Sequence, residues 1–248
     1  MKELPLARRA PAYFESSVDS TNLVLRRMAA AAADGTAVAA REQSAGRGRS
    51  GRSFLSPPGG LYLSMLLRPH VEAERLPTLT PVAAVAVCRA IERVCGVSGA
   101  IKWPNDVVLG GKKICGILVE SVLGSEKPCV IVGIGVNANT RQFPDELRPI
   151  AGSIRDVTGT DCDLGALAAA LIEELDACYA AWLTDAAGAL DEYRGRCLTV
   201  GREVLVGDRR GFARAIGGDY SLLVDYPDGS SQSVRFGEVS VRGLYGYV

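Results

Sequence analysis

The segment from residue 46 to residue 52 constrains this chain more than any other stretch. It reads Gly46-Arg47-Gly48-Arg49-Ser50-Gly51-Arg52, so that three arginines are interleaved with three glycines. Glycine permits backbone conformations closed to other residues and a close approach to a ligand. Each guanidinium stays charged and presents a planar fork of donors that suits carboxylate or phosphate oxygens. We therefore expect residues 46–60 to form a lid that is mobile alone and orders when an anion binds.

Two phosphate-binding motifs are excluded at this segment. Gly46, Gly48 and Gly51 match the dinucleotide-binding spacing G-x-G-x-x-G, which requires a strand before it and a helix directly after it. Here Pro57-Pro58-Gly59-Gly60 follows, and this sequence cannot begin a helix. The segment also lacks the Gly-Lys-Ser/Thr ending of a Walker A loop. The non-functional alternative is a solvated basic surface loop.

The overall charge shows that these arginines are a local concentration. The 248 residues contain 28 basic and 28 acidic side chains, so the net charge is zero, whereas a bulk nucleic-acid binder carries a basic excess. The hydrophobic fraction of 48% is ordinary for a globular protein. The composition therefore favours a small anion site and predicts no DNA partner.

The seven cysteines do not form a metal motif. They include no C-x-x-C pair, and the chain has a single histidine, His70. Reduced thiols of a cytoplasmic protein are the plain interpretation, and we expect no metal site fixed by the protein alone. The sequence also has no apolar run long enough for a signal peptide or a membrane span.

Hydrophobic periodicity predicts an α+β domain over residues 1–198, with a mixed sheet and flanking helices. The expected strands are 13–15, 36–40, 61–67, 100–103, 107–109, 113–119 and 129–136. The expected helices are 23–33, 76–94, 164–183 and 190–197. Residues 110–111 are Gly-Gly and predict a hairpin. Residues 1–12 are expected to be a loose leader.

The pattern changes at Thr199. Short expected strands at 203–206, 213–216, 221–225 and 233–236 are separated by turns rich in Gly, Asp and Pro. These features predict a small β-barrel over residues 199–248. About fifty residues bury little core by themselves, so we expect this barrel to lean on the larger domain.

Four polar clusters occur at or beside the ends of the expected strands. They are D-S-T-N at 19–22, Q-x-A-G-R-G-R-x-G-R at 43–52, K-W-P-N-D at 102–106 with K-x-x-G-I-L-V-E at 113–120, and G-I-G-x-N at 133–137. In this order the chain resembles the biotin protein ligases. The resemblance resumes at residues 237–242, which are similar to the small SH3-like C-terminal domain of that family. It implies the class II synthetase-like biotin/lipoate ligase fold.

The resemblance implies a two-step reaction. The carboxylate of biotin attacks the α-phosphate of ATP with Mg²⁺, giving biotinyl-5′-AMP and pyrophosphate. A lysine of a biotin carboxyl carrier protein or domain then attacks the mixed anhydride and releases AMP. Such chemistry requires that two anions be held together and the phosphoryl charge be neutralised.

The same resemblance implies roles for individual residues. Arg47 and Arg49 would hold the biotin carboxylate and the adenylate phosphate, and Lys113 would be the cation at the reacting centre. The remaining implied biotin-site residues are Ser20, Thr21, Gln43, Gly46, Gly116 and Gly133. The remaining implied adenylate-site residues are Arg52, Asn137 and Asp106, of which Asp106 would face either the Mg²⁺ or the attacking lysine. Less specific candidates are Asn22, Trp103, Asn105 and Arg242.

Simpler roles compete with several of these assignments. Ser20 or Thr21 could cap the following helix, Asp106 could form a turn, and Gly133 could only permit close strand packing. Trp103 could fix the turn at the following proline rather than contact substrate. Arg242 could form a salt bridge between domains.

The resemblance is to the monofunctional members of the family. The signature starts at residue 13, which leaves no room for the winged helix-turn-helix with which many members begin. The alternative enzyme is a lipoate–protein ligase, which shares the fold and the adenylation step, but whose signature places a histidine near the glycine run. A non-catalytic binding module is the third reading. The sequence favours neither a monomer nor a dimer.

Overall fold

The computed structural model describes residues 1–122, 128–184, 187–235 and 241–243. Eight strands form one mixed sheet in the order β1-β2-β3-β4-β8-β7-β6-β5. Within it β2 and β3 are parallel, and the other neighbouring strands are antiparallel. The strands are β1 (Lys2–Glu3), β2 (Ala12–Glu15), β3 (Ala37–Ala40), β4 (Leu61–Leu67), β5 (Ala100–Lys102), β6 (Asp106–Leu109), β7 (Lys112–Val122) and β8 (Cys129–Val136).

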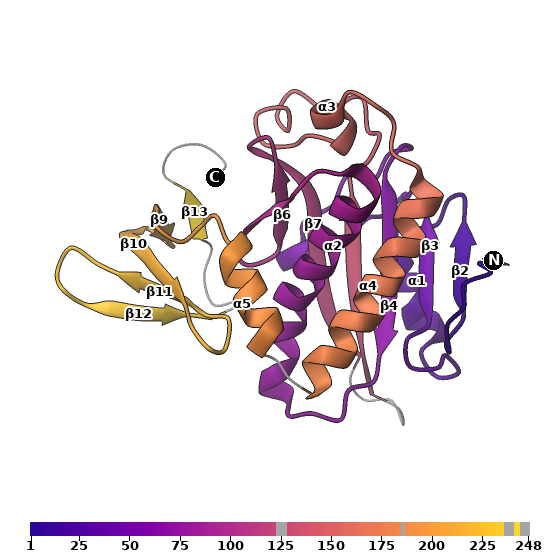
Figure 1. Ribbon diagram of the computed structural model, residues 1–248, viewed down its shortest axis with the longest axis horizontal. Helices are drawn as coiled ribbons and strands as arrows, with labels where there is room; N and C mark the ends of the chain where they lie inside the picture. Colours follow the sequence, from indigo (N-terminus) through magenta and orange to yellow (C-terminus); the bar gives the residue numbers. More distant parts are fainter. Residues whose placement is uncertain (123–127, 185–186, 236–240, 244–248) are drawn as a thin grey trace.

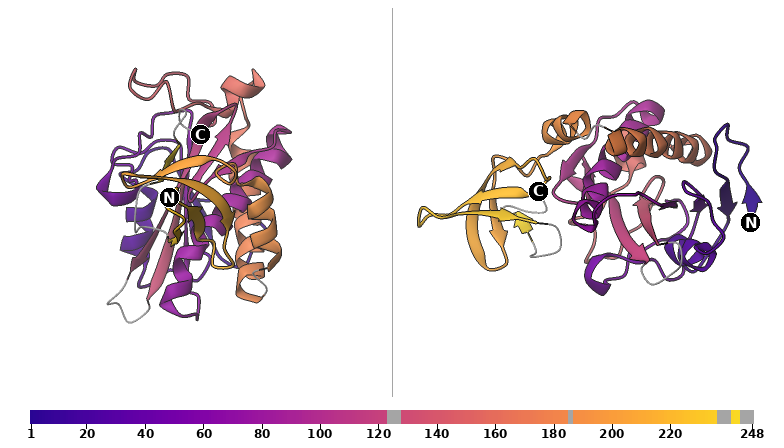
Figure 2. Two further views of the ribbon diagram at one scale, coloured as in Figure 1. Left: turned by 90° about the vertical axis from the view of Figure 1, so that its left-hand side faces the viewer. Right: turned by 90° about the horizontal axis from the view of Figure 1, so that it is seen from below.

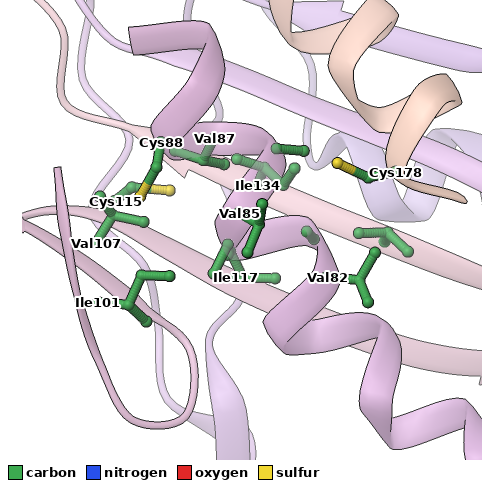
Figure 3. Close-up of a cluster of buried hydrophobic side chains, with 14 of the residues drawn as sticks. Val82, Val85, Val87, Cys88, Ile101, Val107, Cys115, Ile117, Ile134 and Cys178 are labelled. Atoms are coloured by element: carbon green, nitrogen blue, oxygen red, sulfur yellow. The ribbon is translucent and has the colours of Figure 1, made fainter. Parts of the chain in front are cut away.

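Two long helices, α2 (Leu79–Cys95) and α4 (Leu164–Thr184), cover one face of this sheet, with α5 (Ala187–Arg196) beside α2 (Figures 1 and 2). In the core under α2, Val82 and Val85 lie over Ile117 and Ile134 (Figure 3). Alanine and valine along α2 let the helix approach the sheet closely, and this contact forms the main core.

The short helix α1 (Thr21–Met28) covers the lower half of the opposite sheet face. Its Leu25 is fully buried against Val38, Leu66 and Ile131. Residues 131, 133 and 135 of β8 point to the same face because side chains alternate along a strand. The rest of that face, around Gly133 and Gly135, is left for the loop that precedes α1 and the loop that follows β3, which are joined by hydrogen bonds from Ser44 N to the Val18 carbonyl and from Ala45 N to the Asp19 carbonyl.

A second sheet stands to one side of the main sheet (Figure 1). Its order is β12-β11-β10-β9-β13. The strands are β9 (Glu203–Val206), β10 (Arg209–Ile216), β11 (Leu222–Asp225), β12 (Ser231–Val234) and β13 (Val241–Gly243). Trp103 connects the two sheets, since its main-chain N donates to Thr199 Oγ1 and its indole Nε1 donates to the Tyr220 carbonyl, both at 2.9 Å.

The α+β class and the separate C-terminal sheet are as predicted, whereas the loose leader is wrong. Strand β1 pairs with β2, and Arg8 donates two hydrogen bonds to Asp176 of α4, at 2.9 and 2.7 Å. Arg8 and Asp176 are 168 positions apart in the chain, so local sequence patterns carry no signal for their contact. The boundary between residues 198 and 199 stays a prediction.

Three helices differ from expectation. The helix predicted over 23–33 begins at Thr21 and ends at Met28. The helix predicted over 76–94 begins as the 3-10 helix η2 (Ala73–Thr78), which contains Pro77, and becomes α-helical at Leu79. The short helix α3 (Ile154–Thr158) was not predicted, although Ser153 and Asp156 form a capping box at its start. No helix among the described residues combines the length and the apolar character needed to cross a membrane.

Candidate active site

Glycines on two adjacent strands leave a bare strip on the upper half of the sheet face that carries α1. Gly116 of β7 lies opposite Gly135 of β8, and Gly133 lies two residues along β8. A Cβ atom at Gly133 would lie 2.2 Å from Asn22 Oδ1, and one at Gly135 would lie 2.4 Å from the ring of Phe54. Glycine is required at both positions because other groups rest directly on the backbone.

The arginine loop, residues 46–56, folds over this glycine strip. Phe54 N donates to the Gly46 carbonyl at 2.9 Å, and Gly48 N donates to the Arg52 carbonyl at 2.7 Å, so the loop closes as a narrow hairpin. A Cβ atom at Gly46 would lie 2.3 Å from the Phe54 carbonyl, which explains the glycine there. The hairpin carries the Phe54 ring onto Gly116 and Gly135.

The arginines of the loop have different surroundings. Arg47 Nη2 lies 3.3 Å from Glu120 Oε1 of β7. Arg49 Nη1 donates to Asn105 Oδ1 at 2.9 Å, and burial lowers the pKa of Arg49, an effect that Asp106 opposes. Arg52 is exposed. Arg47 and Arg49 therefore contact side chains on or beside the sheet from one loop, and their roles toward ligands stay predictions.

Lys113, next to the hairpin turn in β7, and Asp106, the first residue of β6, form an ion pair. Lys113 Nζ lies 2.6 Å from Asp106 Oδ1. Asp106 is paired in the sheet with Lys102 on one side and Gly116 on the other. Burial lowers the pKa of Lys102, and the charge of Lys113 acts in the same direction while Asp106 opposes it. With Arg49, the cluster has three cations around one carboxylate, which suits a polyanionic ligand.

Polar side chains at the start of α1 form a second group beside the glycine strip. Thr21 N donates to Gln43 Oε1 at 2.8 Å, and Gln43 Nε2 donates to Ser56 Oγ at 3.0 Å. Ser20 occupies the N-cap position of α1, but its side chain makes no capping hydrogen bond. The helix-capping alternative for these hydroxyls is therefore not what the structure shows.

Asn137 directly follows β8 and lies beside Ile114, the neighbour of Lys113 in the sequence. Its main-chain N donates to the Ile114 carbonyl at 2.7 Å, and its carbonyl accepts from Ile154 N at 2.9 Å. Lys113 is held from the same side, because its main-chain N donates to the Ile150 carbonyl at 2.8 Å. Residues 150–154 thus hydrogen-bond to both Lys113 and Asn137, the two residues of this region that were expected at the adenylate.

The remaining candidates fall outside this arrangement or outside the described side chains. The indole of Trp103 donates to the carbonyl of Tyr220, in the turn between β10 and β11, in keeping with a role in the turn. Arg242 lies in β13, opposite Leu205, and only its backbone is described. Residues 237–240 lie outside the described residues.

Three residues of the site were not predicted from the sequence. Phe54 covers the glycine strip, Ser64 lies under Thr21, and Glu120 receives Arg47. A polar Ser64 within the apolar strand β4 was a visible signal. Glu120 stood in the motif K-x-x-G-I-L-V-E, but its partners come from distant parts of the chain.

No group of three or more His, Cys, Asp or Glu side chains that could hold a metal ion occurs in the described part of the chain. Asp106 can still contribute one carboxylate to Mg²⁺. This fits the ion, which is usually bound through one or two carboxylates together with substrate phosphates.

Known proteins resemble this chain in sequence and in fold. The model of the Biotin/lipoate A/B protein ligase family matches residues 14–137. The biotin–[acetyl-CoA-carboxylase] ligase of Mycobacterium tuberculosis is 31% identical over 228 residues, covering 88% of this chain and 84% of that protein. The bifunctional ligase/repressor BirA of Bacillus subtilis is 44% identical over 136 residues, or 53% of this chain, and the match spans 42% of its length.

A solved structure matches almost the whole chain. The biotin protein ligase from Aquifex aeolicus in complex with biotin and ATP is 30% identical, with a TM-score of 0.83. The match covers 94% of this chain and 98% of that one. The two sheets, the order of the motifs and these matches lead to one conclusion: the chain belongs to the biotin/lipoate A/B protein ligase family.

Proposed function

We propose that this protein is an ATP-dependent biotin–protein ligase that forms biotinyl-5′-AMP and transfers the biotinyl group to a lysine of a biotin carboxyl carrier protein or domain. The observation that carries the proposal is that a polar, an apolar and a cationic region follow one another along one sheet face. A polar group at Thr21 and Gln43 is followed by the apolar glycine strip and then by the cations around Asp106. Biotin has the same order, with a ureido ring, an aliphatic chain and a carboxylate.

In the first step the residues position two anions. The Thr21 and Gln43 side chains bind the ureido ring, the glycine strip accepts the valeryl chain, and Arg47 orients the carboxylate. Arg49 and Lys113 neutralise the charge that develops on the α-phosphate as the carboxylate attacks and pyrophosphate leaves. Mg²⁺, when bound with ATP, neutralises further phosphate charge, and Asp106 is the carboxylate that would hold it.

In the second step the acyl group moves to the carrier. The lysine amine attacks the carbonyl carbon of the mixed anhydride, and AMP leaves with its phosphate held by Arg49. In the alternative role, Asp106 orients the incoming amine instead of the metal.

Asn137 and residues 150–154, beside the ion pair, form the adenine side of the site.

The proposal extends to the organisation of the chain. Residues 1–198 form the catalytic domain and residues 199–248 the SH3-like domain, which is supported by the separate sheet β9–β13. The zero net charge supports a function without DNA. The seven cysteines are free thiols, which supports a cytoplasmic location.

Pyrophosphate release tests this function. The full chain is mixed with Mg²⁺ and ATP, and then with biotin, lipoate or neither. Release that depends on biotin is expected, whereas release that depends on lipoate would assign the second ligase activity of the family. No release with either acid would contradict the proposal and favour a binding module.

A further inference from the structure

A series of hydrogen bonds leads from Glu120 to Gln43. Asn22 Nδ2 donates to Glu120 Oε2 at 2.7 Å, and Ser64 Oγ donates to Asn22 Oδ1 at 2.5 Å. Ser64 Oγ lies 2.6 Å from Thr21 Oγ1. The main-chain N of Thr21 in turn donates to Gln43 Oε1 at 2.8 Å. The three central side chains, Thr21, Asn22 and Ser64, are all buried.

The Glu120 carboxylate, at one end of this series of hydrogen bonds, determines the direction of each hydrogen bond in the series. A carboxylate only accepts, so the amide nitrogen of Asn22 faces Glu120 and the amide oxygen faces Ser64. The Ser64 hydroxyl then donates to Asn22 and turns its lone pairs to Thr21. The Thr21 hydroxyl has one proton, and Ser64 at 2.6 Å takes it in preference to Gln43 Oε1 at 3.2 Å.

Glu120 is held in place by charged groups. Arg47 Nη2 and Arg26 Nη2 lie 3.3 and 3.5 Å from Glu120 Oε1, which leaves Oε2 for Asn22. The side chain is only 15% exposed. Charge-assisted hydrogen bonds are stronger than neutral ones. Glu120 is therefore held more firmly than the neutral side chains in the middle of the hydrogen-bond series.

On the basis of the proposed function, we infer that Glu120 is a positioning residue for the cyclic urea, because through Asn22 and Ser64 it makes Thr21 Oγ1 an acceptor for a ring N–H. The main-chain N of Thr21 is already committed to Gln43. A ring with oxygen in place of that N–H brings a lone pair against the lone pair of Thr21. A buried site built to hydrogen-bond a donor rejects the analogue that lacks it.

Calorimetric titration of the full chain without ATP tests this role. The ligands are biotin and two cyclic carbamate analogues, in each of which one ring N–H is replaced by oxygen. One analogue is expected to bind the wild-type protein at least about tenfold more weakly than biotin. Ser64→Ala frees the Thr21 proton, and Glu120→Gln lets the Asn22 amide turn over. In both variants, the dissociation constant of that analogue is expected to exceed that of biotin by about threefold or less.

Matched variants control for loss of structure. Ser221→Ala removes another buried, hydrogen-bonded serine, and Glu174→Gln removes another arginine-paired carboxylate, both outside the site. Both are expected to keep the wild-type ratio. The measured quantity is a ratio of affinities, so a partly unfolded fraction of any variant cancels.

Each other outcome overturns the inference. A wild-type protein that binds biotin and both carbamates equally shows that Thr21 does not accept a ring N–H. If the ratio of analogue to biotin dissociation constants is unchanged in Ser64→Ala and Glu120→Gln, Glu120 does not set the direction of the hydrogen bonds that lead to Thr21. A wild-type protein that binds no biotin contradicts the proposed function itself, and this result is distinct from the other two.

Discussion

Lys113 Nζ lies 2.6 Å from Asp106 Oδ1 in a hairpin whose turn is Gly110-Gly111. The hairpin places Asp106 opposite Gly116 and Lys113 opposite Val108, and the ion pair joins the two neighbouring strands. Arg49 approaches this pair from the arginine loop through Asn105. An anionic ligand that enters here meets a preformed cationic cluster, and the proposed function requires that Lys113 exchange Asp106 for the phosphate.

Lys113→Ala is expected to reduce biotin-dependent pyrophosphate release by about 100-fold or more, because removal of a group that stabilises developing charge costs about this much. Melting followed by circular dichroism is expected to show a folded protein. Lys2→Ala is the control, since this exposed lysine lies in β1 at the opposite edge of the sheet. Near-normal release by Lys113→Ala would mean that another cation serves the reacting centre.

Arg49→Ala is expected to let biotinyl-5′-AMP escape. The guanidinium reaches the site from a loop and is fixed by Asn105, so its loss removes a clamp on the adenylate phosphate. Dissociation of the adenylate, followed by loss of bound radiolabel, is expected to be faster by about tenfold or more. Arg41→Ala, at an exposed arginine that lies over Phe14, is expected to leave the rate unchanged. An unchanged rate in Arg49→Ala would remove the clamp role.

Gly135→Ala is expected to weaken biotin binding by about tenfold or more, because a Cβ atom there intrudes on the space that Phe54 or a ligand occupies. Gly188→Ala is the control, since a Cβ atom at Gly188 meets nothing within 4 Å. Titration calorimetry measures both. Equal affinity in Gly135→Ala would show that the ligand does not lie on the glycine strip.

The arginine loop is expected to become ordered when ligands bind. Phe54 occupies the glycine strip in this structure, so a ligand on the strip must move it and reclose the loop over itself. Amide hydrogen exchange over residues 46–60 is expected to slow when biotin and ATP are added. High protection of the ligand-free loop is the result that contradicts this expectation.

Trp103→Phe is expected to destabilise the protein by about 1–3 kcal/mol, because the Tyr220 carbonyl loses its buried donor. The activity per folded molecule is expected to change little if Trp103 only fixes the turn. Thermal melting and pyrophosphate release measure the two effects separately. A large loss of activity without loss of stability would assign Trp103 to the substrate site.

Much of the candidate site was visible in the sequence because its residues stand in compact motifs. Lys113, Asp106 and Arg49 were predicted, and the structure brings them together. Phe54 was not predicted, because its position on Gly135 depends on how the arginine hairpin folds back onto β8. The loose N-terminal leader was wrong for a related reason, since Arg8 is held by a helix 168 residues away.

The sequence by itself determined the types of most elements and which residues carry charge or polar groups, since hydrophobic periodicity and turn residues act locally. The tertiary structure decided which of these groups meet. Glu120 reaches Arg47 and Asn22 only because β7 lies beside β8, with β4 next and α1 across that face. Strand order is set by the burial of whole faces, a property of the assembled sheet that no short stretch of sequence contains.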